Sequence, residues 1–226
     1  MSRIARIVLP DVPYHITQRG NGRQQVFFHD RDYTLYLDLL RQFHADAHLR
    51  ILAYCLMPNH IHLIAIPERP NAMADALRAT HANYARHYNL EKRSCGHVWQ
   101  ARYFSTPMDT THLWRAMAYV ERNPVRAGLV QYAEHFSWSS ARLRLTSDPA
   151  ASASFIDLAY WRAEYSRDRW KQALQTSVDE EAFGQRLQEA SRHGRPLGND
   201  EFVRQLERRS GRTLRPSPVG RPKKQE

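Results

Sequence analysis

The sequence is poor in cysteine, with only Cys55 and Cys95 among its 226 residues. They form no CxxC pair, which excludes a disulfide framework and a zinc knot built on paired thiolates. Long apolar runs are missing too, since no stretch reaches the ~18 residues of a membrane-spanning helix. The opening MSRIARIVLP holds too short an apolar patch for a signal peptide. We therefore expect a soluble, cytoplasmic protein with no membrane partner.

Acidic residues are outnumbered by basic ones, 23 against 33, so the net charge is +10. Residues 192–226 hold ten Lys or Arg against four Asp or Glu, a net +6 that leaves +4 for residues 1–191. Such an excess is typical of proteins that bind a polyanion, although a solvated tail that aids solubility has the same composition. The asymmetry favours a basic arm or small module after a nearly balanced domain.

Hydrophobic periodicity predicts strands and helices in a definite order. Strands are expected from about Val12, over 50–57, over 60–67 and over 101–109. Helices are expected over 30–48, over about 71–89, and from Thr110 or Thr111 to Asn123, where Pro124 should end the last helix. This order is the βαββαβ pattern of a ferredoxin-like α+β sandwich with one added helix. Its second and third strands form a hairpin, which places strand 60–67 inside the sheet.

Composition divides the chain into four segments. We expect a core over 1–145, a linker over 146–154, a helical extension over 155–215 and a basic, disordered tail over 216–226. The extension should contain helices at 179–192 and 199–209 around HGRPLG, the second capped by Asn199 or Asp200. A helical hairpin of this kind can lie in a DNA groove or serve only for packing.

Two histidines open the apolar strand HIHLIAIP. His60 and His62 are two residues apart, so their imidazoles project from the same face of the strand. Two neutral imidazoles are good ligands for a divalent metal, and they leave positions open for substrate. A pair of surface histidines at a sheet edge would give the same pattern.

The helix that begins near residue 110 carries a candidate nucleophile. Tyr119 lies off the centre of the apolar stripe, and Asn123 follows one turn later. If this helix packs across the sheet, the phenol and the carboxamide face the two histidines. A tyrosine, with a pKa near ~10, attacks a phosphodiester only when the phosphorus is polarised or the phenolate stabilised, and a bound metal supplies the first. An aromatic residue on a half-buried flank is the simpler interpretation.

Four segments together resemble one family. YCLMPNHIHLIAIP, GHVWQARYFS, AYVERNPVRAGLV and GRPLGNDEFVRQLERRSGRTLRP are similar to the REP-associated tyrosine transposases, relatives of the single-tyrosine HUH transposases of small insertion sequences. The resemblance implies that His60 and His62 bind Mg or Mn, that Tyr119 is the nucleophile, and that Asn123 completes the metal site, at a position where relatives vary. It also implies an RRM-like core.

The same resemblance implies an activity and a partner. The family cleaves and rejoins single-stranded DNA at repetitive extragenic palindromic hairpins through a phosphotyrosine intermediate, as metal-dependent endonucleases and strand transferases. We therefore expect a bacterial, nucleoid-associated DNA transposase whose partners are single-stranded and hairpin DNA. A monomer is expected rather than a dimer that exchanges the tyrosine helix.

Basic and aromatic residues near these motifs are candidates for DNA contacts. In the core and the extension they are Arg19, Arg23, Trp99, Arg102, Arg126, Arg195, Arg204 and Arg208. Two other functions stay open. Cys95 and His97 could join the histidine pair in a zinc site, which would leave Tyr119 without a role. A sheet of this type can also bind nucleic acid without any catalytic activity.

Overall fold

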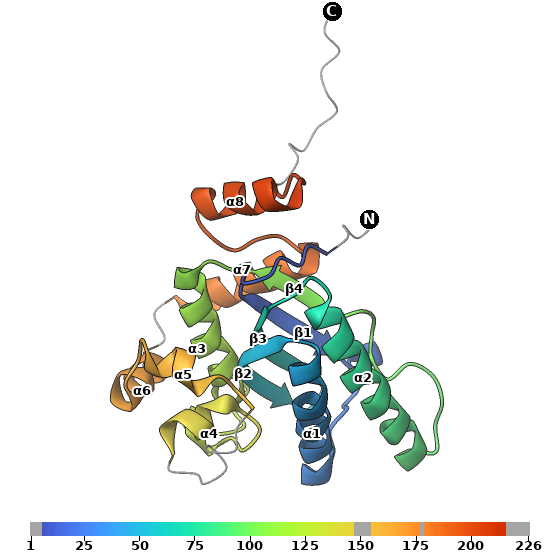
Figure 1. Cartoon of the computed structure of the whole chain (residues 1–226). Helices are drawn as coiled ribbons and strands as arrows, with labels where there is room; N and C mark the ends of the chain where they lie inside the picture. Colours follow the sequence, from blue (N-terminus) through green and yellow to red (C-terminus); the bar gives the residue numbers. More distant parts are fainter. Residues whose placement is uncertain (1–5, 147–154, 177–178, 216–226) are drawn as a thin grey trace, which may run out of the picture.

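The computed structural model describes residues 6–146, 155–176 and 179–215. Its centre is a four-stranded antiparallel sheet in the order β2-β3-β1-β4 (Figure 1). The strands are β1 (Tyr14–Arg19), β2 (Leu49–Met57), β3 (His60–Pro67) and β4 (Phe104–Pro107). With the helices between them, the order is βαββαβ, and the predicted ferredoxin-like α+β fold is confirmed.

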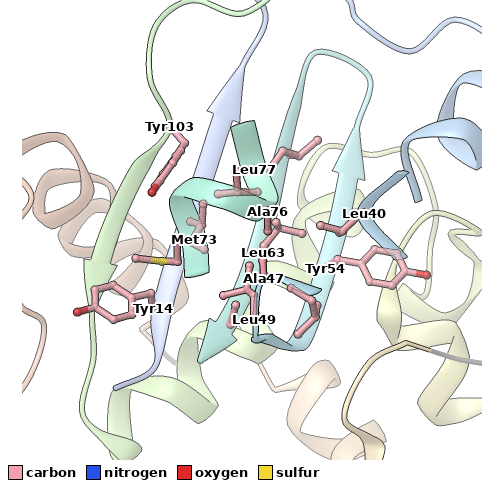
Figure 2. Packing of buried hydrophobic residues seen from close by; sticks show 14 of the residues in the cluster. Tyr14, Leu40, Ala47, Leu49, Tyr54, Leu63, Met73, Ala76, Leu77 and Tyr103 are labelled. Carbon is pink, nitrogen blue, oxygen red and sulfur yellow. The ribbon is translucent and has the colours of Figure 1, made fainter. Parts of the chain in front are cut away.

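Two helices cover one face of the sheet. They are α1 (Asp30–Asp46) and α2 (Ala72–Glu91), which lie side by side in Figure 1. Met73, Ala76 and Leu77 occupy one face of α2, at the spacing of an amphipathic helix, and pack over Leu63 of β3 (Figure 2). The apolar residues of β3 that point to this side therefore join a hydrophobic core under α1 and α2.

The other face is covered by a second hydrophobic cluster. Helix α3 (Thr110–Arg126) crosses it, and the 3-10 turns η1 and η2 span Asn21–Arg23 and Ala133–His135. Of the later helices, α6 and α7 contact α3, and α4 and α5 contact β2. Helix α8 lies beyond α7 at one end of the molecule (Figure 1). These helices are α4 (Ser140–Leu145), α5 (Leu158–Arg162), α6 (Arg167–Gln175), α7 (Glu180–His193) and α8 (Asp200–Ser210).

A buried ion pair ties the extension to the core. Glu121 of α3 and Arg144 of α4 are fully buried and bonded to each other, and the Trp170 indole of α6 donates to the Glu121 carboxylate at 2.8 Å. Arg144 also donates to the carbonyl of Leu52 in β2. Removing one partner of such a pair leaves the other charge buried without compensation. The packing of α3, α4 and α6 on the sheet therefore depends on both residues.

One predicted boundary is wrong. Helix α3 does not end at Asn123 but continues through Pro124 to Arg126. Proline has no N–H for the Val120 carbonyl one turn earlier, and the Asn123 side-chain amide replaces it, donating to Val120 O and to Tyr119 O at 3.2 Å each. The side chain of Asn123 thus repairs the hydrogen bond that its neighbour removes.

The expected helical pair around HGRPLG is present as α7 and α8, and the Asn199 side chain caps α8 by accepting from Phe202 N–H at 2.8 Å. The predicted tail 216–226 and the linker beyond Thr146 lie outside the described residues. The boundary between core and extension stays a prediction. In the described part of the chain, every helix is too short or too polar to cross a bilayer.

Candidate functional site

The alternation of β3 and its register with β1 place the two histidines together. His60 pairs with Arg19 and His62 with Thr17, on the sheet face that α3 covers. Ile61 points to the opposite face and joins the core under α1 and α2. The His60 and His62 rings stand with centroids 4.9 Å apart. The predicted convergence of the imidazoles is therefore present in the folded chain.

Each imidazole is oriented through its Nδ1 atom. His60 Nδ1 lies 2.6 Å from Asn59 Oδ1, and His62 Nδ1 lies 2.9 Å from His15 Nε2. Among the described residues, no hydrogen-bond partner meets the Nε2 atom of either ring. Metal-binding histidines are held in this way, with the non-ligating nitrogen occupied by a neighbouring polar group.

The electrostatics keep both rings neutral. Burial, with the Arg19 guanidinium nearby, lowers the pKa of His60 to about 4. Burial also lowers the pKa of His62 well below its usual range, and the neighbouring His60 and His15 act in the same direction. Neutral imidazole is the form that binds a metal, so the site needs no deprotonation at neutral pH.

Tyr119 lies between the histidines and α7. Its ring is 6.4 Å from the His62 ring, centroid to centroid, and the Arg126 guanidinium lies over it at 4.2 Å. The side chain is only 3% exposed. Its hydroxyl accepts a hydrogen bond of 3.3 Å from the Gln188 amide of α7. The candidate nucleophile is thus beside the histidines but covered by a helix of the extension.

The approach of α7 to Tyr119 depends on a glycine. A Cβ atom at Gly184 would lie 2.6 Å from Tyr119 Cε2 and 3.1 Å from its hydroxyl oxygen. Phe183, the residue before it, meets the same ring edge to face at 6.1 Å. The position accepts no larger residue unless the helix or the ring moves.

The two histidines and Tyr119 line one pocket of about 410 Å³. Its walls are formed by His15, Thr17, Gln18, Arg19, Arg23, His60, His62, Gln100, Phe104, Tyr119, Asn123, Arg126, Gln188, Ser191 and Arg192. The residues predicted to form the metal site and the nucleophile are therefore brought together, with Asn123 Oδ1 at the same pocket. That oxygen is 3.4 Å from the Arg126 guanidinium.

The pocket is positively charged. Four arginines line it, and no acidic side chain of the described residues does. Burial and the nearby charges of Arg23 and Arg192 lower the pKa of Arg19, which shows that like charges are crowded there. Arg126 is partly compensated by Glu180, 4.0 Å away at the start of α7. A pocket of this kind favours an anion such as a phosphodiester.

Other predicted DNA contacts lie outside this pocket. Trp99 is half-buried, packs against Tyr84, and donates its indole N–H to the His81 carbonyl at 3.1 Å, contacts that hold it in the fold. Arg102 is exposed before β4 and Arg195 is half-buried after α7. In α8, Arg204 and Arg208 both pair with Glu201 at 3.1 Å. A role of these residues in DNA binding stays a prediction.

Eight residues of the pocket are absent from the sequence prediction: Thr17, Gln18, Gln100, Phe104 and the four described next. His15 lies on β1, and Gln188, Ser191 and Arg192 lie on α7. His15 shares the strand face of Thr17 and Arg19, and that spacing was the one available signal. Nothing in the local pattern of α7 indicates that it reaches the histidines, because its position depends on packing against α3 and the sheet, which are distant from it in sequence.

The alternative zinc site is not formed. Cys95 and His97 are exposed in the segment between α2 and β4. Across the described ranges, no group of three or more His, Cys, Asp or Glu side chains is arranged to hold a metal. The pocket side chains that we expect to hold a divalent cation are the imidazoles of His60 and His62 and the amide oxygen of Asn123, a set that would leave several coordination positions for phosphate oxygens and water.

Comparison with known proteins agrees with this geometry. The family model described as "Transposase IS200 like" matches residues 9–123, more than half of the chain. None of the curated proteins matches the sequence. A solved REP-associated tyrosine transposase bound to a REP hairpin is similar in fold, with a TM-score of 0.51 and 20% identity over 62% of this chain and 82% of that one.

A protein of Deinococcus radiodurans described as a transposase is also similar, with a TM-score of 0.38 and 20% identity over 54% of this chain and 97% of that one. The family match spans β1 to β4 and ends at Asn123 on α3, so it takes in both histidines, the tyrosine and the asparagine of the pocket. The family expected from the motifs is confirmed: the chain belongs to the IS200-like transposases.

Proposed function

We propose that this transposase cleaves and rejoins single-stranded DNA at palindromic repeat hairpins through a phosphotyrosine on Tyr119. One observation carries the proposal: His60, His62, Tyr119 and Asn123 line the same arginine-walled pocket. A phosphodiester drawn into that pocket by the arginines lies beside a phenol and beside two unprotonated imidazoles. Those are the parts that a metal-assisted transfer to tyrosine requires.

The residues fit a divalent cation, Mg or Mn. The Nε2 atoms of His60 and His62 and the Oδ1 atom of Asn123 would hold it, because the Nδ1 atom of each ring is already engaged. Bound there, the cation would neutralise the non-bridging phosphate oxygens and make the phosphorus a better electrophile. The supporting observations are the engaged Nδ1 atoms and the burial of both imidazoles, which lowers the pKa of each ring and favours its neutral form.

Tyr119 supplies the nucleophile. Its oxygen forms a bond to phosphorus as the phenolic proton leaves, the bond from phosphorus to one sugar oxygen breaks, and that oxygen takes up a proton. The Gln188 amide, 3.3 Å from the phenol oxygen, donates to it and holds the phenol in place before DNA binds. The bond energy is kept in the tyrosyl ester, so the free hydroxyl can reverse the step without ATP.

DNA reaches this tyrosine only if α7 moves. The phenol is covered by Gly184 and Gln188, and Tyr119 shares the pocket with His60 and the arginines. We infer that hairpin binding shifts α7 away from α3. The chain then works as a monomer, since α3 places Tyr119 against the His62 of its own sheet. Light scattering on the purified protein should give the mass of one chain, 26.5 kDa.

The substrate assignment is supported by charge and by a structural neighbour. The pocket attracts phosphates through Arg19, Arg23 and Arg126, and the extension adds Arg195 and the basic face of α8 for the duplex stem. The similar solved transposase is bound to a REP hairpin. Arg102 and Trp99 lie in the segment between α2 and β4, where an unpaired base could stack.

The test is a covalent capture experiment. End-labelled single-stranded hairpins are incubated with Mg or Mn and the wild-type protein, and a protein–DNA adduct that survives denaturation is expected. Tyr119→Phe should abolish the adduct while hairpin affinity stays within a few fold. Tyr132→Phe, at an exposed tyrosine outside the pocket, is the matched control and should react like the wild type.

Chelation separates the metal from the nucleophile. Excess chelator, or His60→Ala with His62→Ala, should prevent the adduct without unfolding the protein. Hairpin binding with no adduct under any metal would contradict the proposal and leave a nucleic-acid-binding module. An adduct that persists in Tyr119→Phe would assign the chemistry to another residue.

A further inference from the structure

His15 forms a chain of hydrogen-bonding groups behind the metal site. Its Nε2 lies 2.9 Å from His62 Nδ1, and its Nδ1 lies 3.3 Å from the Ser191 hydroxyl of α7. Thr106 of β4 donates to the same Ser191 oxygen at 2.9 Å. The two imidazoles are stacked with their planes 19° apart, and all four side chains are buried. These hydrogen bonds join four elements, β1, β3, β4 and α7.

Only one arrangement of protons in this series of hydrogen bonds allows His62 to bind a cation. Two neutral imidazoles share one N–H between them, which belongs either to His15 Nε2 or to His62 Nδ1. If His15 donates, the proton of His62 sits on Nε2 and blocks the ligating lone pair. If His62 donates, its Nε2 is free and the proton of His15 moves to Nδ1, where Ser191 accepts it.

We propose that His15, supported by Ser191, is a positioning residue that holds His62 in the tautomer whose Nε2 binds the divalent cation. The inference rests on the proposed function, because it requires a cation at His60 and His62. It extends that function to two residues outside the ligand set. One of them, Ser191, belongs to α7, which also covers Tyr119, so the extension shapes both the metal ligand and the nucleophile.

Metal affinity, not activity, is the first measurement. Mn²⁺ binding to the whole chain is measured by calorimetry and by the loss of free-ion paramagnetic resonance signal, for the wild type, His15→Phe, His15→Gln and Ser191→Ala. Phenylalanine keeps a ring but accepts no hydrogen bond, and it should weaken binding about 10- to 100-fold. Glutamine places an oxygen near the position of Nε2 and should bind within a few fold of the wild type. Ser191→Ala should fall between them.

The tautomer itself is read by nitrogen NMR of labelled histidine. In Mg²⁺-loaded wild type, the His62 Nδ1 resonance should be that of a protonated nitrogen, and this signature should be lost in His15→Phe. A purely structural role would instead lower the metal-free melting temperatures of His15→Phe and His15→Gln alike, with equal loss of affinity in both. That result, or wild-type affinity in His15→Phe, would overturn the inference.

The outcome for the proposed function is separate. If the wild type binds Mn²⁺ no better than a His60→Ala, His62→Ala double variant, the metal site itself fails, and the role of His15 falls with it. If the wild type binds and both His15 variants bind equally well, the metal site stands and only the positioning role is rejected.

Discussion

The short side chain of Asn123 meets two separate demands. Its amide nitrogen donates to Tyr119 O and Val120 O, filling the bond that Pro124 cannot make, while its oxygen lines the pocket. The two ends of the carboxamide thus serve different purposes: the nitrogen keeps α3 intact near Tyr119, and the oxygen, which accepts from the Arg126 guanidinium at 3.4 Å, is the atom that would bind the cation in the proposed mechanism. A residue that supplies an oxygen alone could meet only the second demand.

Substitution separates these roles. Asn123→Ala removes both ends and should lower the free energy of unfolding by about 1–3 kcal/mol, because the buried Val120 carbonyl loses its donor. It should also weaken Mn²⁺ binding. Asn123→Asp keeps an oxygen but no donor, so it should lose similar stability in metal-free urea unfolding and retain metal affinity. Wild-type stability in Asn123→Asp would show that the donor role contributes nothing.

At the scale of elements, the contact between α3 and α7 covers Tyr119. Gly184 lets α7 lie directly on the Tyr119 ring, and an ion pair of 3.0 Å between Arg122 and Glu180 holds the start of α7 to α3. The helix is therefore fastened at its first turn and packed at its middle. In the proposed mechanism, access of DNA to the phenol would depend on the stability of this contact.

Gly184→Ala tests that packing, because helix propensity and the contact with Tyr119 act in opposite directions. In an isolated helix, alanine is more favourable than glycine by about 1 kcal/mol. Here the added Cβ would lie 2.6 Å from the Tyr119 ring, so the contact should weaken by about 1–3 kcal/mol. Amide hydrogen exchange in residues 180–193 should become faster. Gln185→Ala, at an exposed position of the same helix, should leave exchange unchanged; slower exchange in Gly184→Ala would contradict the packing described.

At the scale of the whole molecule, buried neutral histidines couple folding to pH. Burial lowers the pKa of His15 and of His81 to about 3, and His81 Nε2 lies 2.9 Å from the Tyr36 hydroxyl. Above pH ~6.5 these rings are neutral in both the folded and the unfolded chain, so they add no pH dependence. Below it, the unfolded chain takes up protons that the folded chain does not, and stability decreases.

Between pH 7 and pH 5, the free energy of unfolding should therefore fall by about 1–2 kcal/mol for each of these two histidines. Urea unfolding at both pH values, with chelator present, measures the difference. The glutamine in His81→Gln can still accept a hydrogen bond from Tyr36. This variant should remove the contribution of one histidine to the pH-dependent loss of stability. A pH-independent stability over this range, or an unchanged slope in His81→Gln, would refute the burial assigned to these rings.

Local periodicity explains how much of the site could be predicted. The two-residue period of a strand puts His60 and His62 on one face, and the helical period puts Asn123 one turn after Tyr119, in any fold that contains these elements. The order of strands and helices likewise followed from apolar patterning. The end of α3 was mispredicted, because the rule for proline takes no account of a side chain that replaces the lost donor.

By itself, the sequence determined the elements, the faces of His60 and His62, the spacing of Tyr119 and Asn123, and the excess of basic charge. Only the tertiary structure decided that α3 lies on the histidine face, that the register of β1 brings His15 to His62, and that α7 returns to cover the tyrosine. The physical reason is the distance along the sequence over which each interaction acts. Backbone geometry sets periodicity within a few residues, whereas these contacts arise from burying side chains that are separated by many tens of residues.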